Sequence, residues 1–376
     1  MLPYTGDYIE HIEPGKNSLK FYSFTPRPLM RGNIYQMDDE LAMLLIDAHR
    51  NIGFLEGLIK YAPNKEAFAE LMLLKECTYS RMIDYDNPDF KEVLTSRGTG
   101  KGNISPIIDL EAAYRAALNM EICAPDLSRI CGIALYRESE DNPMSVRDHQ
   151  TFWLGAKTNL KGYNPTAPDA VLPALADISA YLYNDQNTDP LIKAALVHYQ
   201  FEMIHPFERY NGIVGRIIVP MMLSDIAREA KLLICLSEYL YHNKNEYFDL
   251  LRSTQYSGGY IRWIKFFVNA VGEVAKKSAK LMTQYERIIA LDEHRLTEIG
   301  KSTKSIFEIY NYLKDRLMNI STMFLLLRNS SDCCLFAFAS LPHMSIGARV
   351  IRAVALQQIN HAPHAKASTE SNNEGL

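Results

Sequence analysis

The chain has 376 residues, of which 47% are hydrophobic and 22% are charged, and its formal net charge is -4. This balance is typical of a soluble protein with two or three domains, and no basic surplus marks the whole chain as a nucleic-acid binder. The sequence has no apolar run of about 18 residues and no basic and apolar leader. We therefore expect a cytoplasmic protein that neither spans nor binds a membrane.

Helical periodicity recurs along the chain, while strand signals are few, so the predicted fold class is mainly α. The six cysteines lack zinc-site spacing and most lie in apolar surroundings, which indicates free thiols and no structural disulfide. The tail at 361–376 is rich in Ala, Ser, Asn and His and is predicted to be disordered. The predicted helices cover residues 38–60, 65–84, 106–120, 171–184, 191–204, 220–230, 245–252 and 260–291.

A turn followed by a helix start lies in the middle of the chain. Asn211-Gly212 precedes an apolar run from Ile213 to Val219, which favours a helix beginning at this pair. A glycine turn that leads into a helix gathers unpaired backbone N–H groups at the positive end of the helix dipole, so it is a candidate phosphate site. The preceding apolar helix would place His205 beside this site. Alternatively, His205 merely ends one core helix.

Residues 205–216 read His-Pro-Phe-Glu-Arg-Tyr-Asn-Gly-Ile-Val-Gly-Arg. They resemble the signature of the Fic family, His-Pro-Phe-x-Asp/Glu-Gly-Asn-Gly-Arg-x-x-Arg. The resemblance extends over roughly residues 38–290, and it implies a helical Fic core with a small β-hairpin flap and a C-terminal winged-helix-like module. The implied domains are an N-terminal helical region at 1–100 with an inhibitory helix at about 70–84, a Fic core at 101–295, a winged-helix-like module at 296–360 and the tail.

Fic adenylyltransferases move AMP from ATP to a Ser, Thr or Tyr hydroxyl of a target protein. The resemblance implies that His205 is the general base that deprotonates this hydroxyl, which then attacks the α-phosphate of ATP. It also implies a set of residues that bind the nucleotide or its phosphates, namely Arg209, Tyr210, Asn211, Gly212, Gly215, Arg216 and Asn243.

Three residues of the motif depart from the family pattern. Arg209 replaces the acidic ligand of Mg²⁺; a guanidinium cannot hold a metal, although it can contact phosphate oxygens. Tyr210 replaces a glycine and crowds the phosphate cradle, and Ile213 replaces an arginine that would contact the triphosphate. We therefore expect weak, metal-independent or altered AMP transfer. The alternative is a catalytically silent module that senses nucleotides or binds proteins.

Many relatives carry an inhibitory helix of pattern Ser/Thr-x-x-x-Glu-Gly/Asn, whose glutamate pairs with the last arginine of the motif. Here Ser80 and Asp84 take the corresponding places and share one helix face. The resemblance implies that Asp84 pairs with Arg216, through a side chain one methylene shorter and so as a weaker brake. Alternatively, Asp84 is a solvated helix end. Glu56-Gly57 is a competing match that lacks the hydroxyl residue.

Two further regions are expected to contact partners. Residues 142–167 are the candidate for the flap that docks a protein target by strand addition, or else form a buried loop anchored by Trp153. Residues 306–359 resemble the winged helix-turn-helix of relatives. Arg349 and Arg352 are too few cations for strong DNA binding, so a structural role or a role in homo-oligomers is favoured over DNA reading.

Overall fold

The computed structural model describes residues 5–12, 20–30, 34–62, 65–85, 89–99, 103–136, 143–152 and 164–298. The chain divides into two compact units, one made of residues 1–93 and 103–286 and the other of residues 94–102 and 287–376. The first unit contains the predicted motif. Residues 299–376 lie outside the described ranges, and with them nearly all of the predicted winged-helix-like module and the whole predicted tail.

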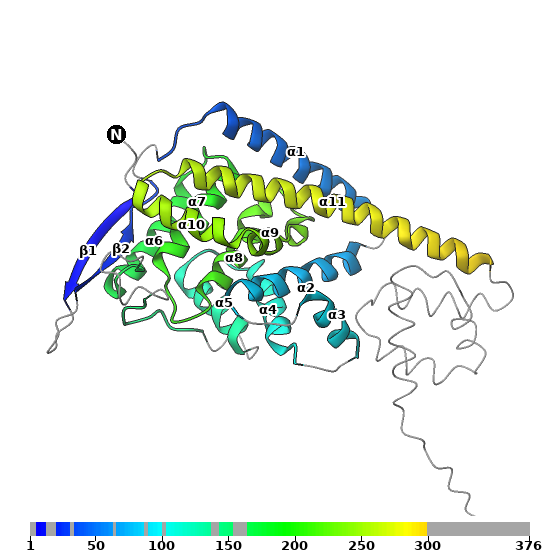
Figure 1. The fold of residues 1–376 in the computed structure, drawn as a ribbon, viewed down its shortest axis with the longest axis horizontal. Coiled ribbons are helices and arrows are strands. Elements are labelled where there is room, and N and C mark those ends of the chain that lie inside the picture. Colours follow the sequence, from blue (N-terminus) through cyan, green and yellow to red (C-terminus); the bar gives the residue numbers. More distant parts are fainter. Residues whose placement is uncertain are drawn as a thin grey trace, which may run out of the picture. The chain divides into compact units, whose positions relative to one another are not determined.

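The described fold is mainly α-helical, as predicted, with one two-stranded antiparallel hairpin (Figure 1). Most helices lie within a few residues of the ranges expected from periodicity. The elements are β1 (Gly6–Ile12), β2 (Lys20–Pro26), α1 (Asp39–Tyr61), α2 (Lys65–Asp84), α3 (Phe90–Thr99), α4 (Ser105–Ala117), α5 (Ala124–Tyr136), α6 (Pro168–Asn184), α7 (Pro190–Ile204), α8 (Asn211–Met222), η2 (Leu223–Asp225), η3 (Lys231–Leu233), α9 (Leu236–His242), α10 (Lys244–Ser257) and α11 (Ile261–Glu298).

The predicted helix over 220–230 is wrong. Helix α8 starts at Asn211 and ends at Met222, and the chain continues through the short 3-10 turns η2 and η3. Pro220 lies in the last turn of α8, where it lacks the N–H that would donate to the carbonyl of Arg216. The sequence past Pro220 therefore forms short irregular turns, which bury Leu223 and Leu233, and not a new helix.

The described hairpin lies in the N-terminal part of the chain, and residues 153–163, the middle of the region predicted for the flap, lie outside the described residues. In β1 and β2, Tyr8 pairs with Phe24 and Ile12 pairs with Lys20. The described parts of the predicted flap, 143–152 and 164–167, contain no strand, and Trp153 lies outside the described residues. The aromatic enrichment of residues 21–24 is the strand signal that would have found the hairpin.

The predicted flap region nevertheless reaches the hairpin. The N–H of Phe24 donates to the carbonyl of Asn164 (3.1 Å), and the Thr166 hydroxyl donates to the carbonyl of Phe24 (3.0 Å). Thr166 also donates from its backbone N–H to the carbonyl of Met203 in α7 (3.3 Å). Residues 164–166 therefore connect β2 to the end of the central helix.

Helix α7 is the centre of the first unit. From Leu191 to Ile204 every residue except Lys193 is buried, as expected for a helix that is hydrophobic on all sides. The indole Nε1 of Trp263 in α11 donates to the carbonyl of Ala195 (2.8 Å). Because α7 is packed all around, its C-terminal end has a well-defined position.

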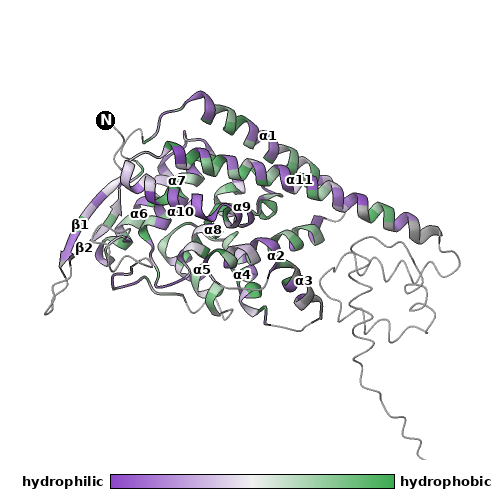
Figure 2. Ribbon diagram, in the orientation of Figure 1, coloured by the Kyte–Doolittle hydropathy of each residue, from purple (hydrophilic) through white to green (hydrophobic). Residues whose placement is uncertain are grey.

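Helix α1 and the N-terminal part of α11 are amphipathic, and Figure 2 shows hydrophilic and hydrophobic residues alternating along both. Helix α1 buries one stripe of apolar side chains, in which residues recur every three or four positions. These are Leu41, Leu45, Ala48, Ile52, Leu55 and Ile59. Within the described ranges, no helix has both the length and the hydropathy that crossing a membrane requires.

Candidate functional site

The loop between α7 and α8 begins with His205. This residue caps α7 in the left-handed conformation, with φ 52° and ψ 62°. Its Nδ1 atom is inaccessible to solvent. Burial and the nearby positive charge of Arg147 lower the pKa of His205 to about 4. At neutral pH the imidazole is therefore uncharged, which is the form that can accept a proton.

A side-chain clasp closes the loop. The Oδ1 atom of Asn211 accepts a hydrogen bond from the N–H of Phe207 (2.8 Å), and its Nδ2 atom donates to the carbonyl of Phe207 (2.7 Å). Asn211 is 2% exposed, so both ends of its amide are engaged inside the loop. Its role here is to shape the turn, which presents the first turn of α8 as a fixed group of N–H donors.

Tyr210 and Arg209 lie just before α8. Tyr210 has φ 66°, the left-handed conformation that glycine adopts without cost and that costs another residue about 1–2 kcal/mol. The glycine in the family signature therefore corresponds to a real backbone requirement, which Tyr210 meets under strain. Arg209 is exposed, and its carbonyl faces the thiol of Cys131 (3.8 Å).

Arg216 meets the end of α2. Its side chain is 1% exposed; Nε donates to Ser80 Oγ (2.8 Å), and Nη2 donates to the Ser80 carbonyl (2.9 Å) and to Asp84 Oδ2 (2.5 Å). The structure thus brings together Ser80, Asp84 and Arg216, the residues expected to form the inhibitory contact. The competing Glu56 lies elsewhere, because its carboxylate accepts from the backbone of residues 229 and 230.

The Asp84 carboxylate lies over the first turn of α8. A Cβ atom added to Gly212 would lie 3.0 Å from Asp84 Oδ2 and 3.0 Å from Arg216 Nη1. The absence of a side chain at Gly212 therefore makes room for an anion between the helix backbone and the guanidinium. Burial disfavours a charged guanidinium, yet the charge of Asp84 keeps the pKa of Arg216 above its ordinary value. The space between Gly212 and Arg216 therefore suits a negatively charged group, and the Asp84 carboxylate occupies it.

Comparison with known proteins agrees with this geometry. Residues 123–223, which include α5 to α8 and the whole loop, match the model of the Fic/DOC family. This part of the chain is a Fic domain. The described fold resembles the crystal structure of a Fic family protein from Desulfovibrio desulfuricans G20, with a TM-score of 0.57 and 18% identity over 66% of this chain and 77% of that chain.

Curated relatives that the chain matches are named protein adenylyltransferases. The chain is 38% identical over 64 residues to protein adenylyltransferase fic-1 of Caenorhabditis briggsae, covering 16% of this chain and 12% of the relative. It is 28% identical over 113 residues to probable protein adenylyltransferase aq_aa38 of Aquifex aeolicus (strain VF5), covering 30% of this chain and 31% of the relative. The matches thus span less than a third of the length of either relative.

Gly215 of the Fic domain faces α7 and not the loop. A Cβ atom there would lie 2.3 Å from Glu202 Oε1 and 3.2 Å from the ring of Phe201. Because Gly215 is buried against these side chains, the structure assigns it a role in helix packing, where the sequence expected a phosphate contact. Asn243 likewise uses its amide locally, donating to the carbonyl of Tyr239 (2.9 Å) at the start of α10.

Glu202 is an ionisable group that the motif does not reveal. Burial raises its pKa to about 8; nearby Arg216 opposes this rise and Asp84 adds to it. The native protein therefore binds the Glu202 proton more tightly than the unfolded chain, whose ordinary pKa is 4.5. Stability linked to this proton is greatest below pH 4.5 and is lost as the pH rises from 4.5 to about 8.

We expect Glu202→Gln to stabilise the protein increasingly over this pH window, by an amount on the order of a few kcal/mol at pH 8 and little at pH 4.5. Unfolding midpoints of both proteins across this range measure the effect. Glu238→Gln is the matched control of opposite sign, because Lys75 and Lys277 (both 2.8 Å) hold the pKa of Glu238 below its ordinary value. A gain for Glu202→Gln that is the same at pH 5 and pH 8 would contradict this account.

Arg81 and Tyr85 attach the end of α2 to the Fic loop, a role that the sequence motif does not indicate for either residue. Arg81 Nη1 donates to Tyr210 Oη (2.6 Å), and the guanidinium carbon lies 4.9 Å from the Tyr85 ring and 5.5 Å from the Tyr210 ring. Lys244 adds a bond from Nζ to the carbonyl of Ile83. Tyr210, which replaces a glycine in the motif, thus contacts the end of α2. In the sequence, the spacing of four residues between Arg81 and Tyr85 is the signal that indicates a shared helix face.

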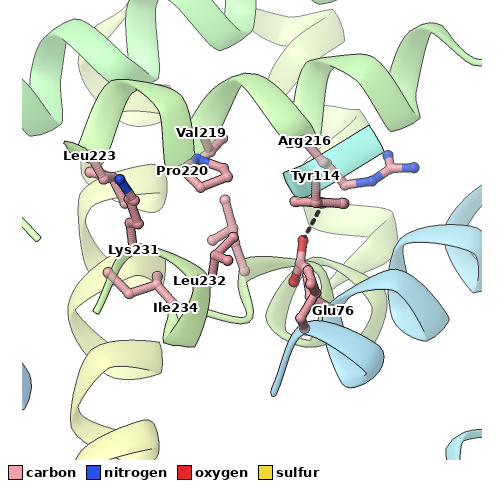
Figure 3. A pocket seen from close by; sticks show the side chains of 11 residues that line it. Glu76, Tyr114, Arg216, Val219, Pro220, Leu223, Lys231, Leu232 and Ile234 are labelled. Carbon is pink, nitrogen blue, oxygen red and sulfur yellow. Dashed lines mark hydrogen bonds between the residues drawn. The ribbon is translucent and has the colours of Figure 1, made fainter. Parts of the chain in front are cut away.

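A small cavity lies beside α8, and Arg216 is one of the residues that line it. Figure 3 shows Val219 and Pro220 above Leu232, with the hydrogen bond from Tyr114 Oη to Glu76 Oε1 (2.8 Å) to the right of them. In this view the Arg216 guanidinium points away from the apolar lining. Neither Gly212 nor Asp84 lines this cavity, so it is separate from the anion position over Gly212.

The loop residues do not fit the Mg²⁺ ion that the family implies. Arg209 occupies the place of the acidic ligand, and a guanidinium carries no lone pair for a cation. Glu208 is exposed at the neighbouring position. Among the described residues, no group of three or more His, Cys, Asp and Glu side chains is arranged to hold a metal.

Proposed function

We propose that this protein is an autoinhibited nucleotidyltransferase of the Fic type, which transfers AMP from ATP to a Ser, Thr or Tyr hydroxyl of a protein slowly and without the usual metal site. One observation carries the proposal: the uncharged His205 precedes the start of α8, where an anionic group of the same chain, the Asp84 carboxylate, already binds. The names of the curated relatives support the reaction class.

His205 would act as the general base. An uncharged imidazole accepts the proton of the target hydroxyl while its oxygen attacks the α-phosphorus, and pyrophosphate leaves as that bond breaks. The N–H groups at the start of α8 and the guanidinium of Arg216 would stabilise the phosphate charge. Both parts are held rigidly, the first by the Asn211 clasp and the second by Ser80.

Autoinhibition follows from the place of Asp84. Its carboxylate occupies the position over Gly212 and uses an N–H of Arg216, so a terminal phosphate and Asp84 compete for the same donors. Arg81 and Lys244 hold the same end of α2 against the loop and α10. We therefore propose a brake stronger than the shorter side chain of Asp84 alone suggested, with α2 moving away before nucleotide binds fully.

The second candidate is a silent module that binds nucleotides or proteins. It is favoured by Arg209 and by Tyr210, whose ring is held by Arg81 in place of an open glycine turn. For either function, a protein target would dock beside the loop, in the region of residues 142–167. We further propose that any role in DNA binding or in homo-oligomers belongs to residues 299–376, which lie outside the described ranges.

Incubation of the full chain with labelled ATP separates these functions. We expect slow self-labelling that is insensitive to Mg²⁺ and to a chelator, and a loss of roughly 10²- to 10⁴-fold in His205→Ala. His198→Gln is the matched control, because His198 is a core residue that bonds Gly215 and Tyr247. No labelling in the natural protein or in Asp84→Gly, together with ATP binding in calorimetry, would overturn the enzyme and support the silent module.

A further inference from the structure

Arg147 lies in the segment between α5 and α6 and is 4% exposed. Within the described part of the chain, the Arg147 guanidinium donates only to backbone carbonyls, and the backbone N–H of Arg147 donates to the carbonyl of Pro206 (3.0 Å). Arg147 therefore engages the three consecutive residues 204–206, which form the end of α7 and the start of the Fic loop. The side-chain bonds run from Nε to His205 O (2.7 Å), from Nη1 to His149 O (3.0 Å), and from Nη2 to Ile204 O (3.1 Å) and Thr166 O.

These contacts hold the backbone of His205, which has the left-handed conformation. The last carbonyls of a helix lack partners within the helix, and a left-handed residue that is not glycine persists only where its surroundings hold it. The planar fork of an arginine can reach several carbonyls at fixed angles, which a lysine ammonium cannot do. The guanidinium thus stabilises the carbonyl of the very residue whose backbone is unusual.

We propose that Arg147 is the positioning residue for His205: its fork fixes the left-handed turn at the end of α7 and so sets where the imidazole lies relative to the first turn of α8. The catalytic effect of this positioning rests on the proposed function. The position of the His205 ring can be measured in the protein without substrate. Arg147 lies outside the sequence motif, 58 positions before His205, so the motif does not predict its role.

The charge of Arg147 supports this role. Among the residues that the structure describes, no carboxylate pairs with it, and burial lowers the pKa of Arg147 to about 10, so that it is still a cation at neutral pH. Beside His205 this cation adds to the effect of burial in lowering the pKa of the imidazole. Asp84 of α2 and a backbone hydrogen bond with Glu202 act in the opposite direction.

The test compares Arg147→Lys and Arg147→Met with the natural full-length chain. The His205 ring signals are identified by their absence in His205→Ala and are titrated by NMR from pH 3 to pH 8. Lys193→Met is the matched control: Lys193 also donates to a carbonyl at a helix end, that of Asp185, but lies in the first turn of α7. The 15 residues of α7 separate that turn from His205 by about 20 Å.

We expect the His205 ring signals to shift or broaden in both Arg147 variants, because neither replacement has the fork. We also expect the pKa of His205 to rise in Arg147→Met, where the nearby positive charge is lost, and the self-labelling rate to fall about tenfold or more in both variants. Lys193→Met should leave the ring signals of His205 unchanged.

Unchanged His205 signals in a folded Arg147→Met protein would overturn the proposal and leave Arg147 as a structural tie. If Arg147→Met does not fold, the spectrum of Arg147→Lys decides in the same way. Shifted signals in a protein that never labels would refute the proposed reaction and leave the positioning role intact, so the two failures are distinguishable.

Discussion

Asp84→Gly is expected to tighten ATP binding by about ten- to a hundredfold. The carboxylate now uses an N–H of Arg216 and lies over Gly212, where it both occupies the anion position and repels an incoming phosphate. A hydrogen bond between charged groups contributes roughly 1.5–3 kcal/mol, which corresponds to this range of affinity. Isothermal titration calorimetry with ATP measures the change.

Two controls separate charge, volume and local disorder. Asp84→Asn keeps the side-chain shape and removes the charge, so its affinity should lie between those of the natural protein and Asp84→Gly. Ser80→Ala removes the bond from Arg216 Nε but leaves the carboxylate in place, so it should not tighten binding. Equal ATP affinity for the natural protein and Asp84→Gly would mean that the end of α2 has only a structural role.

Arg209→Asp combined with Tyr210→Gly, in the Asp84→Gly background, is expected to raise self-labelling with Mg²⁺ by roughly a hundredfold or more. The first change supplies an acidic ligand at an exposed loop position. The second removes the strain of a left-handed tyrosine and opens the turn. Stabilisation of developing charge by such an element contributes about 2.7–4 kcal/mol to the transition state, hence the size of the effect. The rate of label incorporation with Mg²⁺ and with a chelator measures it.

The third departure from the family motif should be left unchanged. Ile213 is fully buried in α8, and Ile213→Arg would place a guanidinium in the core. Tyr210→Gly alone, in the same background, is the control that opens the turn without adding a metal ligand. If the natural protein labels as fast as the combined variant, Arg209 already serves the reaction; if the combined variant folds, binds ATP and stays silent, the catalytic reading of this site is wrong.

The local features of this protein were determined by sequence. The apolar composition of residues 191–204 dictated a buried helix, Asn211-Gly212 marked the start of α8, and the four-residue spacing of Ser80 and Asp84 put both on one face of α2. Such patterns need only a helical period and the properties of single residue types. The resemblance to the Fic signature added which of these residues share a site.

Only the tertiary structure decided the contacts that shape the site. Arg147 is 58 residues from His205, Arg81 is 129 residues from Tyr210, and the raised pKa of Glu202 reflects burial that no local pattern records. The reach of the short Asp84 side chain to Arg216, over 132 positions, also depends on how α2 packs beside α8. These properties belong to the packing of distant segments, because hydrogen bonding, desolvation and charge act over a few ångströms in space and not along the chain.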